Sequence, residues 1–310
     1  RSGLLVILDV NGALLMRVHR ASNSVLNTLN QIRKYDCILN NRYIWLRPYL
    51  DPFLKYLLNR HSVGVWSSMQ TQNVTATVNE VFHIHQCLPP NALYKESMKW
   101  DVGSLAHGLS ELSVSSEQSQ HKLEFVFDRL ATEPDPRGPK AHSTLKNLSQ
   151  VWKLKGGKLY SADTTVIIDD SDEKLRLQPR NLVKVPEFET EDGSNVDLLG
   201  DDALIWLAMY IELITNGGIL VGDVREKIGA VSFAAFCKQG RVWLKDEHDG
   251  RSLKDVSEWP NSRQEFLREV RKWTQKTKES DADESQQNKL DAELAQMITK
   301  VNIESNLEPK

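Results

Sequence analysis

Five short apolar segments in the first two-thirds of the chain limit its fold most strongly. They are Leu4–Leu8, Ser62–Trp66, Leu123–Phe127, Thr165–Ile168 and Leu182–Val185. Each is rich in branched or aromatic residues, which is typical of strands covered on both faces. Stretches with helical periodicity separate them, and we expect helices at about Tyr49–Asn59, Gln72–Phe82, Thr144–Trp152, Asp202–Ile214 and Val221–Phe236. This alternation predicts an α/β fold, a Rossmann-like parallel sheet with helices on both faces.

The last third of the chain has a different character. We expect residues 1–239 to form the α/β domain and residues 240–310 to form a charged connector followed by an amphipathic helical C-terminal extension. The final apolar stripe consists of Leu290, Leu294, Met297, Ile298 and Val301. Such a helix either packs back on the parent domain or docks on a protein partner.

Composition excludes several classes of function. A net charge of -3 and a pI near 6.3 make nucleic acid an unlikely main ligand. Three scattered cysteines form no disulfide framework, so an intracellular, reducing location is expected, nuclear or mitochondrial. No run reaches about 18 consecutive apolar residues, so no membrane span is expected. A targeting segment upstream of Arg1 would not be visible in this sequence.

Polar residues follow three of the predicted strands. Asp9 ends the first strand, Ser67 follows the second, and the pair Asp169-Asp170 follows the fourth. Because parallel strands bring their carboxyl ends to one edge of the sheet, these side chains are expected to converge there. Carboxylate and carbonyl oxygens are the ligands that Mg²⁺ prefers, and a carboxylate that attacks phosphorus needs such a cation. Asp9 is therefore a candidate nucleophile and metal ligand.

Two further residues fit a phosphate site, and each has an ordinary alternative. The hydroxyl and backbone N–H groups around Ser67 can hold a phosphoryl oxygen, although a serine there can also cap the following helix. Lys146, at the start of a predicted amphipathic helix, can offset the charge of the carboxylates and a phosphate, although most helical lysines are solvated.

The motifs in their order resemble those of the haloacid dehalogenase superfamily. The segments are LLVILDVNGALL, VGVWSSMQTQNV, LKNLSQVW and TTVIIDDSDEKLRLQPRNLVKVPEF. They are most similar to the branch of RNA polymerase II C-terminal-domain phosphatases and NLI-interacting-factor-like phosphatases, which includes the phosphatase-like receptor of the mitochondrial inner-membrane translocase. The resemblance implies a haloacid-dehalogenase-like fold.

The resemblance also implies a role for each site residue. Asp9 matches the phosphoaspartate nucleophile, Ser67 the hydroxyl of the second motif and Lys146 the lysine of the third. Asp169 and Asp170 match the metal-binding pair. The residue two positions after the nucleophile gives its backbone carbonyl to Mg²⁺ in this superfamily, so Asn11 is expected to retain that role.

Two departures from the family pattern affect the chemistry. Asn11 stands where the family has the aspartate that acts as general acid and base, and Ala13 replaces a threonine near the nucleophile. Because an amide cannot transfer the proton, we predict a catalytically impaired phosphatase that serves mainly as a protein-binding or assembly component, with a phosphoprotein or a large complex as partner. The alternative is a slow Mg²⁺-dependent serine/threonine protein phosphatase working through a phosphoaspartate. His19 and Asp51 are the candidates for the missing acid.

Overall fold

The structure is a computed structural model, and it describes residues 3–83, 123–138, 143–154, 160–215 and 222–247. The chain divides into two units, Arg1–Cys237 and Lys238–Lys310. The first unit contains every element discussed below except the end of the last helix. The predicted C-terminal amphipathic helix at Leu290–Val301 lies outside the described residues.

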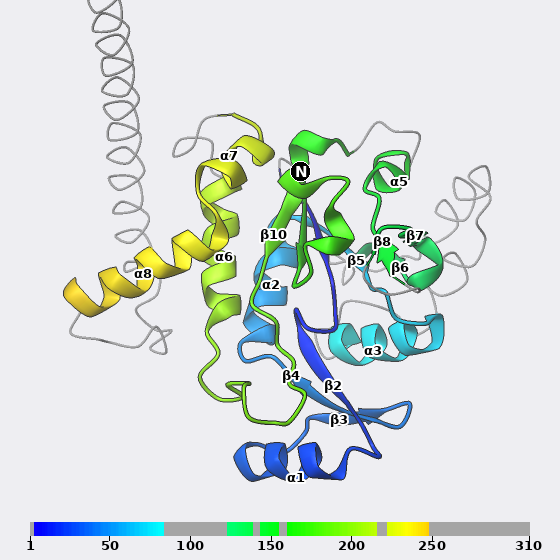
Figure 1. Cartoon of the computed structure of the whole chain (residues 1–310). Coiled ribbons are helices and arrows are strands. Elements are labelled where there is room, and N and C mark those ends of the chain that lie inside the picture. Colours follow the sequence, from blue (N-terminus) through cyan, green and yellow to red (C-terminus); the bar gives the residue numbers. More distant parts are fainter. Residues whose placement is uncertain (1–2, 84–122, 139–142, 155–159, 216–221, 248–310) are drawn as a thin grey trace, which may run out of the picture. The chain divides into compact units, whose positions relative to one another are not determined.

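A five-stranded sheet forms the centre of the first unit (Figure 1). Its order is β10 (Leu182–Lys184), β9 (Thr165–Asp169), β1 (Leu5–Leu8), β5 (Ser62–Trp66) and β6 (Leu123–Phe127), and all neighbouring pairs are parallel. All four residues of β1 are buried, so both faces of this central strand are covered. The parallel α/β sheet predicted from the sequence is confirmed.

Helices pack on both faces of the central sheet, and alternate residues of each strand point to opposite faces. One face contributes Leu5, Ile7 and Ile167 to a core that also holds Leu148 and Val151, at the start of α5 (Ser149–Trp152). Elsewhere α2 (Leu50–Arg60) packs against both β5 and α6 (Ala203–Thr215). Helix α3 (Thr71–His83) follows β5 along the chain.

A second, antiparallel sheet was not predicted from the sequence. It consists of β2 (Leu15–His19), β4 (Arg42–Leu46) and β3 (Cys37–Leu39), in that order. Asn40 and Asn41 turn the chain between β3 and β4 with φ of 47° and 61°, a left-handed conformation that asparagine tolerates. Helix α1 (Asn23–Ile32) contributes Val25, Leu26 and Leu29 to the core beside this sheet.

Two predicted helices were wrong. Thr144–Leu145 is the short strand β8, paired with β7 (Glu133–Pro134), and the helix begins only at Ser149, whose N–H donates to the Asn147 side chain. The expected helix Val221–Phe236 is two helices, α7 (Val224–Ala230) and α8 (Phe233–Glu247). The break falls at Val231, where the backbone is extended and the carbonyl accepts a hydrogen bond from the Tyr210 hydroxyl at 2.6 Å.

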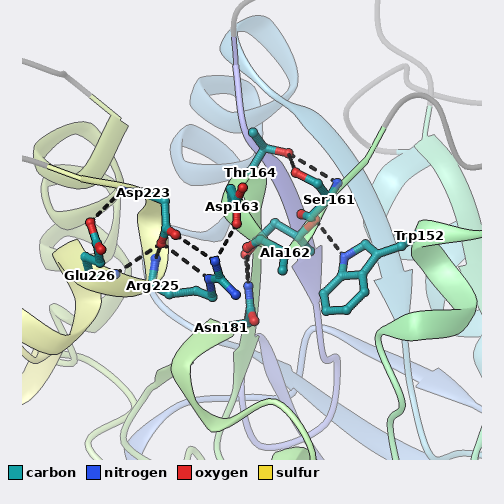
Figure 2. A network of polar contacts seen from close by, with 10 residues as sticks. Trp152, Ser161, Ala162, Asp163, Thr164, Asn181, Asp223, Arg225 and Glu226 are labelled. Carbon is teal, nitrogen blue, oxygen red and sulfur yellow. Dashed lines mark hydrogen bonds and ion pairs between the residues drawn. The ribbon is translucent and has the colours of Figure 1, made fainter.

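Polar contacts fasten α7 to the amino end of β9 (Figure 2). Arg225 joins Asp163 at 2.5 Å to Asp223 at 2.7 Å, and Asp223 also caps α7 through the N–H groups of Arg225 and Glu226. Asn181, which is buried, donates to the carbonyls of Ala162 and Thr165 at 2.7 Å each. These contacts hold the start of the strand whose other end carries Asp169.

Candidate functional site

Three carboxylates meet at the carboxyl edge of the parallel sheet. Asp9 follows β1, Asp169 is the last residue of β9, and Asp170 comes next. Each of the three offers an oxygen within 4.8 Å of the other two. The Asp9 N–H donates to the Ile168 carbonyl at 2.9 Å, so the parallel pairing continues one step past β1 and fixes the two aspartates side by side. The convergence expected from the strand ends is present.

Lys146 is buried among these carboxylates rather than solvated on a helix. Its ammonium lies 3.1 Å from Asp9 Oδ1 and 2.5 Å from Asp169 Oδ2, and its side chain is 0% exposed. The residue precedes α5 in an irregular segment, where its N–H donates to the Lys174 carbonyl at 2.8 Å. Because a buried charge is tolerated only when it is paired, this lysine and the two aspartates depend on one another.

Lys174 is a second cation in the cluster, and the sequence analysis missed it. Its ammonium lies 3.2 Å from Asp9 Oδ2, 3.4 Å from Asp169 Oδ1 and 3.8 Å from Asp170 Oδ1. Burial disfavours its charged form, but the three carboxylates outweigh that effect and raise the pKa of Lys174 above its ordinary value. The only sequence signal was a lysine five positions after Asp169.

The two aspartates of the pair have different electrostatic environments. Burial opposes ionisation of Asp169, yet the charges of Lys146 and Lys174 hold its pKa below the ordinary value. Burial raises the pKa of Asp170 to about 7, with the charges of Asp169 and Asp9 adding to that rise and Lys174 opposing it. The two lysines therefore favour the ionised form of Asp169, whereas a cation bound next to Asp170 would favour ionisation of that carboxyl.

Asn11 contacts a carboxylate that the sequence analysis did not identify. Its side-chain amide donates to Glu189 Oε1, while the Phe188 N–H donates to the Gly12 carbonyl at 2.7 Å. The loop after β10 is thus paired with the loop that follows Asp9. Burial, followed by the charge of Glu187, raises the pKa of Glu189.

The two residues expected to replace the missing acid lie elsewhere. His19 is exposed at the end of β2, and Asp51 is exposed on α2, where it pairs with Lys55 at 2.9 Å. Neither lines the pocket around Asp9. The expectation for His19 and Asp51 was wrong, and Glu189 is the carboxylate that reaches Asn11.

Ser67 is buried at the end of β5 and points into the same site. Its N–H donates to the Phe127 carbonyl at 2.9 Å, and its Oγ accepts from the Met69 N–H at 3.3 Å. Helix α3 begins at Thr71, so Ser67 is not its cap. The neighbouring Ser68 Oγ is buried without a hydrogen-bond partner among the described residues.

A pocket of about 530 Å³ opens over these groups. Carboxylates dominate its lining, and Lys174 is the only cation in it among the described residues. The full lining is Asp9, Asn11, Ser67, Ser68, Met69, Asp170, Ser171, Asp172, Glu173, Lys174, Glu187 and Glu189. Such a surface attracts cations, and it favours an anion only if a cation binds with it.

The donor set fits Mg²⁺. Asp9, Asp169 and Asp170 supply carboxylate oxygens close enough to share one ion, and oxygen is the ligand atom that Mg²⁺ prefers. Asp170 Oδ1 and Asn11 Oδ1 are buried and accept no hydrogen bond from the described residues. These oxygens are available to a cation or to its bound water.

None of the described helices is long and apolar enough to cross a membrane.

The chain is similar to one curated protein and to two solved structures described here. An uncharacterised FCP1 homology domain-containing protein of the fission yeast Schizosaccharomyces pombe is 28% identical over 198 residues, which cover 62% of this chain and 64% of that protein. The structure of Fcp1, an essential RNA polymerase II CTD phosphatase, has 14% identity and a TM-score of 0.36, covering 79% of this chain and 55% of that chain. A fission yeast Fcp1 variant bound to beryllium fluoride has 12% identity and a TM-score of 0.37, covering 89% and 62%. This chain thus spans less than two-thirds of each of these three proteins.

The family model gives the assignment. The model of the NLI interacting factor-like phosphatases matches residues 4–124 and 118–214, which include all six site residues predicted from the sequence. The resemblance seen in the motifs is confirmed. On this match over more than half of its length, the chain belongs to the NLI interacting factor-like phosphatase family.

Proposed function

We propose that this protein is a catalytically impaired member of its family that binds phosphorylated protein segments in a magnesium-dependent pocket. It serves mainly as a binding or assembly component, with a phosphoprotein or a large complex as partner. The observation that carries the proposal is Asn11, an amide at the position that requires a proton donor, in a site that otherwise keeps its charged residues together. An intracellular location, nuclear or mitochondrial, stays a prediction.

The retained residues support phosphate binding. Asp9, Asp169 and Asp170 would hold Mg²⁺, with the Asn11 backbone carbonyl as a further ligand. When bound, Mg²⁺ would neutralise charge on the phosphoryl oxygens. The Ser67 hydroxyl, and that of Ser68, which has no hydrogen-bond partner among the described residues, would hold a phosphoryl oxygen. Lys146 would orient Asp9 through its 3.1 Å contact.

Loss of the proton donor affects both halves of a phosphoaspartate reaction. A seryl leaving group needs a proton as it departs, and the water that hydrolyses the phosphoaspartate must give one up. General acid–base assistance typically contributes about 10²–10⁴-fold in rate. An amide at residue 11 cannot supply it, so turnover is expected to fall by roughly that factor while binding survives.

The test compares hydrolysis with binding. Mg²⁺-dependent hydrolysis of an aryl phosphate and of a phosphoserine peptide is measured for the wild type, Asn11→Asp and Asp9→Asn. Binding of a non-hydrolysable phosphonate analogue of the same peptide is measured in parallel. We expect the wild type to bind the analogue with little hydrolysis, and Asn11→Asp to gain activity. Efficient wild-type turnover that Asp9→Asn abolishes would contradict the proposal.

A second candidate function is a slow Mg²⁺-dependent serine/threonine protein phosphatase that works through a phosphoaspartate on Asp9. The contact between Glu189 and Asn11 favours it, because a carboxylate lies beside the position of the family's acid. Burial raises the pKa of Glu189, which keeps a proton on it at higher pH than on an exposed glutamate.

Substitutions at Glu189 and Asn11 distinguish the slow phosphatase from the catalytically impaired protein. If Glu189 supplies the proton, Glu189→Gln removes residual wild-type turnover, whereas Glu191→Gln, an exposed neighbour outside the pocket lining, does not. The double variant Asn11→Asp/Glu189→Gln keeps an amide–carboxylate pair with the roles exchanged. Activity in the double variant but not in the wild type supports the impaired enzyme.

A further inference from the structure

Lys146 and Lys174 contact different oxygens of the buried carboxylates of Asp9 and Asp169. Lys146 contacts Asp9 Oδ1 and Asp169 Oδ2, at 3.1 Å and 2.5 Å. Lys174 contacts the opposite oxygens, Asp9 Oδ2 and Asp169 Oδ1, at 3.2 Å and 3.4 Å, and lies 3.8 Å from Asp170 Oδ1. Only Lys174 therefore approaches all three carboxylates that would ligate Mg²⁺.

The two lysines differ in how firmly they are held. The side chain of Lys146 is 0% exposed, whereas that of Lys174 is 24% exposed and lines the pocket. Lys174 also belongs to the short 3-10 helix η4 (Glu173–Leu175), next to the exposed Glu173. A lysine has a flexible four-carbon stem and a strongly hydrated head, so its ammonium can leave the cluster for the solvent-filled pocket without unfolding the loop. Lys146 has no such route.

The charges allow one additional cation in the cluster. When all three carboxylates are ionised, they and Lys146 leave an excess of two negative charges, which either Mg²⁺ alone or Lys174 in part compensates. An ammonium and a divalent cation separated by only a few ångströms inside a protein repel each other strongly. Mg²⁺ and the Lys174 ammonium therefore exclude one another from the space between the carboxylates.

We propose that Lys174 is an internal cation that occupies the space between the carboxylates that would hold Mg²⁺, and that it must swing out before Mg²⁺ binds. This inference rests on the proposed magnesium-dependent pocket and adds a control on its loading. The site is stable without metal because Lys174 compensates its carboxylates, and its Mg²⁺ affinity is weakened by the competition. Phosphate binding, which depends on the metal, is weakened with it.

The first test measures Mg²⁺ affinity by isothermal titration calorimetry on the full chain, without phosphate. Lys174→Met keeps the length of the side chain and removes the charge, and we expect it to bind Mg²⁺ at least about tenfold more tightly than the wild type. Lys174→Arg keeps the charge and is expected to bind no more tightly than the wild type. The matched control is Lys55→Met, an exposed lysine paired with Asp51 at 2.9 Å outside the pocket lining, which should stay within about twofold of the wild type.

The second test needs no variant, so it stands even if Lys174→Met does not fold. Wild-type protein is treated briefly with an amine-acetylating reagent with and without Mg²⁺, and each lysine is followed by mass spectrometry. We expect Mg²⁺ to raise acetylation of Lys174 several-fold while the buried Lys146 stays protected and the exposed Lys55 is unchanged. Unchanged or reduced acetylation of Lys174 at saturating Mg²⁺ overturns the inference.

The outcomes separate this inference from the function on which it rests. If the wild type and Lys174→Met bind Mg²⁺ equally, the internal cation is refuted and the magnesium pocket stands. If neither the wild type nor any Lys174 variant binds Mg²⁺, both are refuted.

Discussion

The Lys146 ammonium lies 2.5 Å from Asp169 Oδ2, and both side chains are 0% exposed. Removing one partner of a buried ion pair leaves an uncompensated charge, which typically destabilises a protein by about 3–5 kcal/mol. We therefore expect Lys146→Met to lower the free energy of unfolding by about that amount in urea denaturation at pH 7.

The double variant checks the physical reason for this loss. Lys146→Met/Asp169→Asn removes both charges, so it should be less destabilised than the sum of the two single variants. Strictly additive losses would mean that the two side chains act independently, in conflict with their contact.

The central sheet was readable from the sequence because its strands are short runs rich in apolar residues. The predicted bounds of β5 and β6 agree with the structure, and β1 and β9 are buried at every residue. The strands of the smaller sheet were missed because they are partly polar, as in β2, where Arg17 and His19 alternate with buried residues. The Asn40-Asn41 pair was the sequence signal that could have predicted the turn between β3 and β4.

The site was predicted in part for a similar reason. Strand ends and motifs identified Asp9, Asp169 and Lys146, although the helix assigned to Lys146 was wrong. Lys174 and Glu189 were missed because their roles depend on where loops after β9 and β10 fold, and no periodicity encodes that.

Gly12 connects backbone conformation to the candidate metal site. Its φ is +82°, and a Cβ there would lie 2.6 Å from Asp170 Oδ2. The left-handed conformation alone costs a non-glycine residue about 1–2 kcal/mol, and the close approach displaces the Asp170 carboxylate as well. We expect Gly12→Ala to be less stable and to bind Mg²⁺ at least about tenfold more weakly in calorimetry.

Gly193→Ala is the matched control for that variant. Gly193 also has a positive φ, +91°, and its added Cβ would meet Thr28 at 2.9 Å rather than a carboxylate. It should lose stability and keep its Mg²⁺ affinity. Equal Mg²⁺ affinities in the two variants would show that the conformation of Gly12 does not affect the metal site.

Arg47 is a buried residue that joins loops around the site. It is 1% exposed and donates to the carbonyls of Ala13 and Pro186, at 2.9 Å and 3.0 Å. It also binds both carboxylate oxygens of Asp201, at 3.0 Å and 2.9 Å. A lysine cannot reproduce this fork of donors, so we expect Arg47→Lys to lose about 2–4 kcal/mol of unfolding free energy in urea denaturation.

Arg33→Lys controls for the change of residue type. Arg33 donates from one nitrogen, Nη2, to Asp36 at 3.0 Å and to the Leu46 carbonyl at 2.6 Å, and its side chain is 25% exposed. A lysine ammonium can make both contacts, so the same substitution should cost less than about 1 kcal/mol. Similar losses of unfolding free energy in the two variants would show that the buried hydrogen bonds of Arg47 contribute no more to stability than those of Arg33.

His61 gives the fold a dependence on pH at the end of the sheet away from the carboxylates. Its Nδ1 accepts a hydrogen bond from the Leu4 N–H at 3.3 Å, and its Nε2 has no hydrogen-bond partner among the described residues. Burial, with the charge of Arg60 adding to it, lowers the pKa of His61 to about 4 from 6.5. Between these two values the unfolded chain binds a proton that the folded protein does not. Stability is therefore lost as the pH falls from 6.5 towards 4, by up to about 1.4 kcal/mol per pH unit from this group.

Replacement by asparagine isolates that contribution, because its amide can still accept from the Leu4 N–H and does not titrate. We expect His61→Asn to flatten the dependence of the unfolding free energy on pH between 4 and 6.5. His19→Asn makes the same change at an exposed histidine, whose Nδ1 likewise accepts from a backbone N–H, that of Ala21 at 3.1 Å, and it serves as the control for the substitution itself. If His61→Asn keeps the full wild-type slope, the acid sensitivity arises from other groups and His61 is protonated as readily folded as unfolded.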